Sequence, residues 1–153
     1  LNRLVHQNVR FQYIGREEGI PADILKRLGH CRERTKNNTG LILNLAFNYG
    51  SRQEIVDAAR RALQSGVRPE DLTEERFASY LYTAWQPDPD LLIRTSGEMR
   101  VSNFLLWQIS YAEIWVTPRR WPEFDIATLH EALRDYAGRE RRFGGLNPSG
   151  SGP

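Results

Sequence analysis

The chain has 153 residues, of which 40% are hydrophobic and 26% are charged, and its formal net charge at pH 7 is +2. This composition is typical of one globular domain, and so small a net charge gives no reason to expect a nucleic-acid partner. Cys31 is the single cysteine, which excludes an internal disulfide and fits a reducing compartment. The sequence shows no apolar run long enough to span a bilayer and no signal peptide, so we expect a cytoplasmic protein.

The first part of the chain predicts a strand and a helix. Residues 9–14 alternate between apolar and polar side chains before Gly15, which is the pattern of a half-buried strand. Pro21 can open a helix as a first-turn proline. The apolar face of that helix would be formed by Ile24, Leu25 and Leu28.

Residues 41–47 form a near-continuous apolar run whose one polar member is Asn44. Such a run predicts a central parallel strand that is buried on both faces. Asn48 begins the loop that closes it, and Ser51 with Glu54 predicts a capping box for the next helix. The loop at 48–50 is either a plain strand-to-helix connection, which the residues alone favour, or a place where a ligand binds at a strand end.

The remaining elements follow the same alternation. Thr73 caps a short helix, and Asp125 caps a last helix that buries Leu129, Leu133 and Tyr136. Residues 91–93 and 112–116 predict two short strands, and an apolar helix is expected from Asn103 between them. Strands that alternate with helices predict an α/β fold with a largely parallel sheet.

A polar loop follows the strand at 91–93. It contains Arg94, Gly97, Glu98, Arg100 and Ser102. Arginine forks and free backbone N–H groups near a strand end are typical of sites that hold anions such as phosphate or diphosphate. Each residue also has a structural alternative, because Ser102 can be a helix N-cap, Gly97 a turn, and Arg94 an ion-pair partner of Glu98.

Four segments give this region a specific resemblance: Ile93-Arg-Thr-Ser-Gly-Glu98, Arg100-Val-Ser-Asn-Phe-Leu-Leu-Trp-Gln108, Tyr111-Ala-Glu113 and Trp121-Pro-Glu-Phe124. Together they resemble the signature of the cis-prenyltransferase (isoprenyl transferase) family, and the resemblance extends from Asn8 to Gly145. It implies that residues 1–145 are the C-terminal part of a single domain, with a mostly parallel central sheet flanked by helices. Residues 146–153 are Gly/Pro/Ser-rich, and we expect them to be a disordered tail.

The resemblance also implies roles for individual residues. Arg94, Arg100 and Ser102 match the catalytic groups that grip isopentenyl diphosphate, and Glu98 would organise the two arginines. Asn44 and Asn48 would lie near the allylic substrate. Glu113 matches a magnesium ligand, although a satisfied strand carboxylate is the alternative.

The C-terminal arginines have two interpretations. Arg142, with Arg141 and Gly144, matches a family element that can reach the partner's active site in a dimer. The alternative is a group of arginines in solvent near the end of the last helix, where they complement the helix dipole.

The function that the resemblance implies is magnesium-dependent condensation of isopentenyl diphosphate with an allylic diphosphate, such as farnesyl diphosphate, to give a cis-polyprenyl diphosphate. A homodimer that contacts membranes through its product is expected. The aspartate that usually completes the metal site belongs to an upstream segment, which we expect in a longer parent chain. Two alternatives remain: a non-catalytic partner subunit of a hetero-oligomeric member, and a general polyphosphate-binding module.

Overall fold

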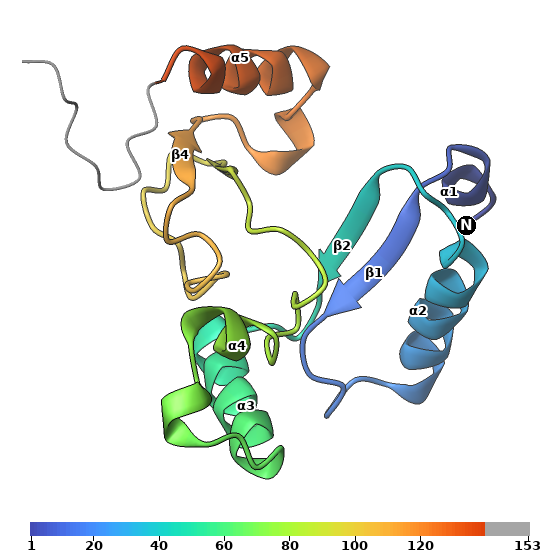
Figure 1. Cartoon of the computed structure of the whole chain (residues 1–153). Coiled ribbons are helices and arrows are strands. Elements are labelled where there is room, and N and C mark those ends of the chain that lie inside the picture. The colour runs from blue at the N-terminus through green and yellow to red at the C-terminus, as the bar shows by residue number, and fades with distance from the viewer. Residues whose placement is uncertain (140–153) are drawn as a thin grey trace, which may run out of the picture. The chain divides into compact units, whose positions relative to one another are not determined.

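The computed structural model describes residues 1–139. These residues form two compact units (Figure 1). The first contains residues 1–87 together with 103–105, and the second contains residues 88–102 and those from 106 onward. Each unit is described by itself. None of the described helices is long and apolar enough to cross a membrane.

The first unit contains seven elements: α1 (Asn2–His6), β1 (Arg10–Ile14), α2 (Ala22–Thr35), β2 (Ile42–Ala46), α3 (Ser51–Gln64), the 3-10 helix η1 (Pro69–Asp71) and α4 (Glu74–Ala78). Strands β1 and β2 are parallel, as the sequence predicts, and Arg10 lies opposite Ile42. Helix α2 packs along β1 (Figure 1). It is joined to the strand by the Thr35 hydroxyl, which accepts a hydrogen bond from the Phe11 N–H at 3.0 Å.

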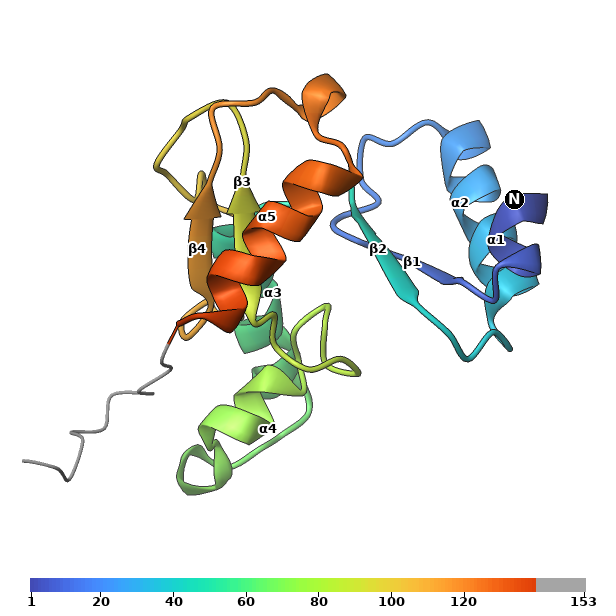
Figure 2. The same ribbon diagram turned by 90° about the horizontal axis from the view of Figure 1, so that it is seen from above.

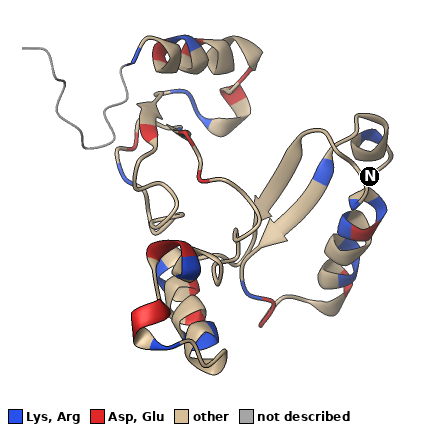
Figure 3. Ribbon diagram, in the orientation of Figure 1, with Lys and Arg blue, Asp and Glu red and all other residues tan. Residues whose placement is uncertain are grey.

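Strand β2 differs from the prediction in its burial. Its apolar side chains are exposed, with Ile42 at 40%, Leu43 at 44% and Leu45 at 42% of their surface. Among residues 1–139, β2 pairs only with β1, so its other edge has no strand partner within these residues. The prediction of a strand buried on both faces is therefore wrong for the described residues. Figure 3 shows that this strand carries no charged residue, whereas α2 and α3 carry both signs of charge.

Helix α3 also begins differently from the prediction. Ser51 is already helical and Gly50 is the N-cap, so the expected capping box between Ser51 and Glu54 is wrong. Glu54 is fully buried instead, where it accepts hydrogen bonds from the Tyr49 hydroxyl and from the Tyr82 N–H at 2.8 Å. A carboxylate with two donors can be buried beside the helix, where it ties neighbouring segments together.

Helix α3 buries only part of its apolar surface. Ala58 and Ala62 of α3 are buried, but Leu63 is 80% exposed. Thr73 caps α4 as predicted, since its side chain accepts a hydrogen bond from the Arg76 N–H at 3.2 Å. The small side chains of α3 let it pack closely with α4.

The second unit contains β3 (Leu91–Arg94), β4 (Glu113–Val116), the 3-10 helix η2 (Trp121–Glu123) and α5 (Ile126–Ala137). The two strands are parallel, and Leu91 lies opposite Glu113. Both were predicted to within one residue at each end. Helix α5 packs against β4, and Figure 2 shows it lying over the pair of strands.

Helix α5 begins as the sequence predicts. Asp125 is its N-cap, and the Asp125 carboxylate accepts a hydrogen bond from the Thr128 N–H at 2.8 Å. The buried residues of the helix are Thr128 and Ala132, whereas Leu133 is exposed. The predicted start is confirmed, but the predicted burial of Leu133 is wrong.

The helix predicted from Asn103 is wrong. Residues 102–111 form a series of turns and bends. The backbone is left-handed at Ser102 (φ 49°), Asn103 (φ 61°) and Leu105 (φ 46°). A right-handed helix cannot run through residues in this conformation, so the apolar periodicity of the segment was misleading. Ser102 is therefore not the N-cap of a helix.

Candidate functional site

The predicted arginines and serine line one pocket. It has a volume of about 670 Å³ and lies in the second unit, where β3 and β4 end. Arg94, Arg100 and Ser102 all line it. The remaining lining residues are Leu92, Glu98, Met99, Val101, Ile114 and Val116. The pocket therefore joins a group of polar and cationic side chains to an apolar wall.

The apolar wall was not predicted from the sequence, although the strand period could have revealed it. Leu92 and Arg94 are two residues apart on β3, and Ile114 and Val116 are two residues apart on β4. Residues separated by two lie on the same face of a strand. The face that presents Arg94 must therefore also present Leu92.

Glu98 organises the two arginines, as predicted. One carboxylate oxygen pairs with Arg94, and the other accepts a hydrogen bond from the Arg100 guanidinium at 2.5 Å. Two backbone hydrogen bonds hold the loop: Ser96 N–H to Arg119 O and Gly97 N–H to Thr117 O, both at 2.8 Å. The loop therefore presents two cations around one shared anion.

Arg94 and Gly97 also have the structural roles that were their alternative interpretations, an ion pair for Arg94 and a turn for Gly97. Arg94 is paired with Glu98, and its buried Nε has no hydrogen-bond partner within residues 1–139. Gly97 has a φ of +66°, which glycine adopts without the penalty of a side chain. A structural role and an anion-binding role are compatible here, because a guanidinium has more donors than one carboxylate uses.

Glu113 begins β4 and forms an ion pair. Its carboxylate accepts a hydrogen bond from the Arg139 guanidinium at 2.8 Å, and Arg139 also pairs with Asp135 at 2.5 Å. The two carboxylates, Glu113 first, raise the pKa of Arg139. No group of three or more potential metal ligands occurs within the described residues. This geometry agrees with the satisfied-carboxylate alternative, and a metal role for Glu113 stays a prediction.

The two asparagines of the first unit differ in their surroundings. Asn48 is left-handed (φ 48°), and its side-chain amide donates to Arg16 O at 3.1 Å and Glu18 O at 2.9 Å. It lines a pocket of about 380 Å³ with Arg16, Glu18, Tyr49, Gly50 and Gln53. The side-chain oxygen of Asn44 is buried and has no partner among the described residues. Asn48 therefore mainly holds the loop at residues 16–18 through its side-chain amide. The Asn44 oxygen can still accept a hydrogen bond.

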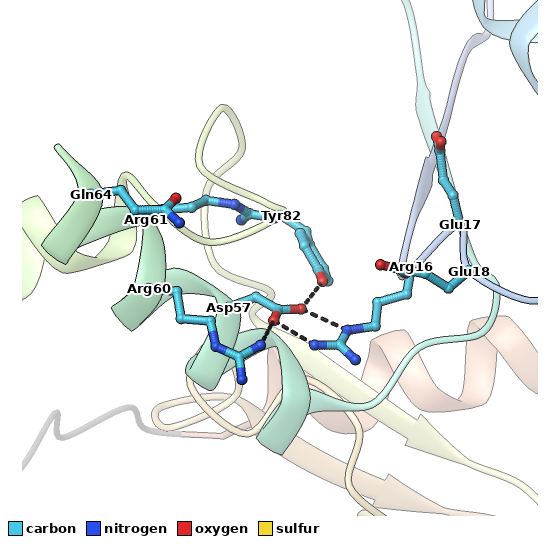
Figure 4. A pocket seen from close by; sticks show the side chains of 9 residues that line it. Arg16, Glu17, Glu18, Asp57, Arg60, Arg61, Gln64 and Tyr82 are labelled. Atoms are coloured by element: carbon cyan, nitrogen blue, oxygen red, sulfur yellow. Dashed lines mark hydrogen bonds and ion pairs between the residues drawn. The ribbon is translucent and has the colours of Figure 1, made fainter.

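A further pocket of about 590 Å³ in the first unit was not predicted (Figure 4). Asp57 lies within it and accepts two hydrogen bonds from the Arg16 guanidinium, at 2.8 and 2.6 Å, and one from the Tyr82 hydroxyl at 2.7 Å. The pairing with Arg16 holds the pKa of Asp57 well below its ordinary value and raises the pKa of Arg16. Burial first, and then Asp57, raises the pKa of Tyr82.

The charges of the residues that line this 590 Å³ pocket are balanced. Its cations are Arg16, Arg60 and Arg61, and its anions are Glu17, Glu18 and Asp57. Arg61 donates to the Tyr80 carbonyl at 2.7 Å and lies over the Tyr82 ring. Because the charges are balanced and Arg16 is already paired, the pocket is a polar packing site rather than an anion receptor. Arg16 and Asp57 are 41 residues apart, so no sequence spacing could have indicated their pairing.

Three predictions lie outside the described residues. These are the role of Arg142, the arginine-glycine element at 141–144 and the disordered tail at 146–153.

The chain is thus an α/β protein with a pocket that two arginines and a serine line together with aliphatic side chains. Such a pocket suits an anion that carries an apolar group. Residues 1–144 match the family model described as putative undecaprenyl diphosphate synthase, and the chain belongs to this family.

The relatives support this assignment. The chain is 52% identical over 146 residues to an isoprenyl transferase of Geobacter sulfurreducens, and the match covers 93% of this chain and 59% of that protein. It is 50% identical over 143 residues to an isoprenyl transferase of Fusobacterium nucleatum, with 94% and 61% covered. The chain thus spans about three-fifths of the length of these curated relatives.

Two solved structures have the same fold. The lavandulyl diphosphate synthase of Lavandula x intermedia, in complex with dimethylallyl diphosphate, has a TM-score of 0.88 at 37% identity, covering 93% of this chain and 64% of that one. A probable undecaprenyl diphosphate synthase of Campylobacter jejuni has a TM-score of 0.83 at 32% identity, covering 94% and 68%. The predicted α/β fold of the cis-prenyltransferases is therefore confirmed.

Proposed function

We propose that the protein to which this chain belongs condenses isopentenyl diphosphate with an allylic diphosphate, such as farnesyl diphosphate, to form a cis-polyprenyl diphosphate. The observation that carries the proposal is the pocket in which Arg94, Arg100 and Ser102 lie beside Leu92 and Ile114. Its two kinds of lining match the two parts of isopentenyl diphosphate. Cations suit the diphosphate, and aliphatic side chains suit the five-carbon group.

The arginines serve binding and positioning. Each guanidinium can make paired hydrogen bonds to phosphate oxygens. Glu98 holds Arg94 and Arg100 toward a common point, so little side-chain freedom is lost when the diphosphate enters. With the diphosphate fixed, the apolar wall directs the double bond of the five-carbon group, which must attack the allylic carbon from one side.

The allylic diphosphate is assigned to the first unit. Asn48 lines a pocket with Arg16 and Tyr49, and Asn44 has a buried acceptor without a partner among residues 1–139. Asn48 follows the carboxyl end of β2, where ligands of parallel α/β proteins bind, and Asn44 lies in the middle of the same strand. Arg142 is proposed to reach the active site of a partner subunit in a homodimer.

Magnesium is the proposed cofactor, and Glu113 is its proposed ligand. A carboxylate oxygen suits this hard cation, and the Glu113 side chain is partly accessible at 29%. The cation, when bound, would neutralise charge on the leaving diphosphate. Magnesium is usually bound by one or two carboxylates together with phosphate oxygens of the substrate and waters, so Glu113 would be one ligand among several. We further propose that the protein is cytoplasmic and touches membranes through its long apolar product.

The test is an incorporation assay with the intact protein. Labelled isopentenyl diphosphate, farnesyl diphosphate and magnesium are incubated with the protein, and the extracted products are separated by chain length. The proposal predicts labelled product that disappears when EDTA is added. No incorporation with farnesyl, geranyl or geranylgeranyl primers would contradict it and would favour a non-catalytic partner subunit, for which the assay is repeated with a catalytic companion.

A further inference from the structure

In the second unit, the segment that follows strand β4 holds the polar loop after strand β3 by backbone hydrogen bonds. The Thr117 N–H donates to the Arg94 carbonyl at 2.9 Å, and the Thr117 carbonyl accepts from the Gly97 N–H at 2.8 Å. The Arg119 carbonyl accepts from the Ser96 N–H, also at 2.8 Å. The contacts between β3 and β4 thus continue beyond the two strands into the polar loop.

The polar loop depends on these contacts because its backbone is left-handed at the turn. Ser96 has a φ of 65° and Gly97 has a φ of 66°. Glycine adopts this region without penalty, but serine does so less readily, and such a conformation persists only where neighbouring contacts fix it. The hydrogen bond from the Ser96 N–H to the Arg119 carbonyl is a contact of this kind. Glu98, which pairs with the two arginines of the pocket, follows two residues after Ser96.

The Arg119 side chain ties the segment after β4 to the start of helix α5, which packs against β4 (Figure 2). Its guanidinium donates a hydrogen bond to the Thr128 hydroxyl, which in turn donates to the Asp125 carboxylate at 2.7 Å. The same guanidinium lies 3.5 Å from a carboxylate oxygen of Asp125 and 3.5 Å from one of Glu131. Thr128 is fully buried and Asp125 is the N-cap of α5, so the helix fixes both partners. Arg119 therefore contacts the polar loop with its backbone and α5 with its side chain.

We infer that Arg119 is a positioning residue for the diphosphate pocket. Its side chain holds the segment after β4 against α5, and its carbonyl thereby fixes the left-handed turn at Ser96, after which Glu98 aligns the two arginines. Arg119 is not among the residues that line the pocket, so it acts through the loop and not by binding the anion. The inference rests on the part of the proposed function that assigns this pocket to a diphosphate.

The principal test compares Arg119→Ala with the unmodified intact protein. Two quantities are measured: the kinetic constants for isopentenyl diphosphate and the Kd of inorganic pyrophosphate. We expect the KM and the Kd to rise about fivefold, the size of effect that accompanies one lost hydrogen bond. The kcat at saturation should change less than about twofold, because saturating substrate restores the bound state. An unchanged KM and Kd in Arg119→Ala would overturn the inference.

Ala132→Gly is the matched control. Ala132 is fully buried in α5, four residues after Thr128, and glycine at this position weakens the helix without removing a partner of Arg119. A merely structural effect of a weaker α5 would appear in both variants, as a lower melting temperature and a lower fraction of active protein. The inference expects the KM for isopentenyl diphosphate and the Kd of pyrophosphate to be unchanged in Ala132→Gly.

Thr128→Val tests the same contact from the side of the helix. Valine has nearly the shape of threonine but has no hydroxyl to accept the hydrogen bond from Arg119. The substitution should raise the KM for isopentenyl diphosphate on its own. In the Arg119→Ala background it should add little, because the guanidinium that the hydroxyl binds is already gone. Additive effects of the two substitutions would contradict the inference.

The outcomes separate the inference from the proposed function. If the unmodified protein neither incorporates isopentenyl diphosphate nor binds pyrophosphate, the proposed function fails, and the inference fails with it. If the protein binds pyrophosphate without incorporating isopentenyl diphosphate, the proposed function fails, and the Kd values of the variants decide the inference. If the protein does both, but Arg119→Ala matches it or Ala132→Gly raises the KM as much, only the inference is overturned.

Discussion

Arg94 and Glu98 form an ion pair directly after strand β3, and the second oxygen of the same carboxylate accepts a hydrogen bond from Arg100 at 2.5 Å. One glutamate therefore sets the positions of two arginines that line the same pocket. The three side chains together carry one net positive charge. Such an arrangement can hold an anion without leaving unpaired cations close together when the site is empty.

Replacement of Glu98 tests whether substrate affinity depends more on the orientation of Arg94 and Arg100 or on the net positive charge of the pocket. Glu98→Gln keeps the size of the side chain but cannot bind both guanidinium groups through charged oxygens. We expect the KM for isopentenyl diphosphate to rise about tenfold, because the arginines lose their common orientation. Glu70→Gln, which removes an exposed glutamate paired with Arg68 at 3.3 Å, is the control and should leave the KM unchanged. A lower KM in Glu98→Gln would mean that Glu98 mainly competes with the substrate.

The two partners Glu113 and Arg139 allow the metal role to be separated from the ion pair. Glu113→Gln and Arg139→Gln both remove the 2.8 Å contact, so we expect a small loss of thermal stability in each, somewhat larger in Arg139→Gln because it also loses the pair with Asp135. Only Glu113→Gln removes a candidate magnesium ligand. It should raise the magnesium concentration for half-maximal incorporation about tenfold, whereas Arg139→Gln should not raise it. Equal magnesium requirements in the two variants would leave Glu113 as a structural carboxylate only.

The pairing of Asp57 with Arg16 predicts a pH-dependent stability. Because the folded state lowers the pKa of Asp57 below its ordinary value of 3.8, the unfolded chain takes up the proton first as the pH falls. The stabilisation is complete above about pH 5 and is lost as the pH falls toward the lowered pKa. Denaturant unfolding of Asp57→Asn should therefore show a loss of stability at pH 7 that shrinks below the ordinary pKa.

Asp71→Asn provides the comparison for this pH dependence. Asp71 also receives two hydrogen bonds from one arginine, Arg68, at 2.6 and 2.9 Å, but its side chain is far more exposed than that of Asp57. Solvent screens the exposed pair, so its loss should affect stability less at every pH. A difference from the unmodified protein that stays constant between pH 7 and pH 3 in Asp57→Asn would contradict the assignment.

The sequence predicted the elements whose signals are local. Strand β1 follows from an alternation of apolar and polar residues, and the other three strands follow from short apolar runs. The caps at Thr73 and Asp125 follow from the residue type before each helix. Within the loop that follows β3, Glu98 could be predicted as the organiser of two arginines because all three lie within seven residues. Arg94, Arg100 and Ser102 line one pocket, and their role in binding a diphosphate stays a prediction.

Features that depend on distant residues were missed. The helix expected from Asn103 does not form, because Asn103 bonds to the start of α3 and its backbone is left-handed. The same contact explains the failed capping box, since the Ser51 N–H is already bound by the Asn103 carbonyl. Neither contact has a sequence signal, as the partners are about fifty residues apart. The apolar pattern of β2 indicated burial, but it does not say which segment covers the strand.

The central claim is that the pocket at the end of β3 binds the diphosphate of isopentenyl diphosphate. Isothermal titration of isopentenyl diphosphate into the intact protein tests it most directly, with Arg100→Ala and Arg60→Ala as the variants. The two arginine side chains are equally exposed, at 65% and 64%, but only Arg100 lines this pocket. The account predicts a Kd that rises about 10- to 100-fold in Arg100→Ala, the effect of losing hydrogen bonds to a charged group, and that does not change in Arg60→Ala. An unchanged Kd in Arg100→Ala, or equal losses in both variants, would contradict it.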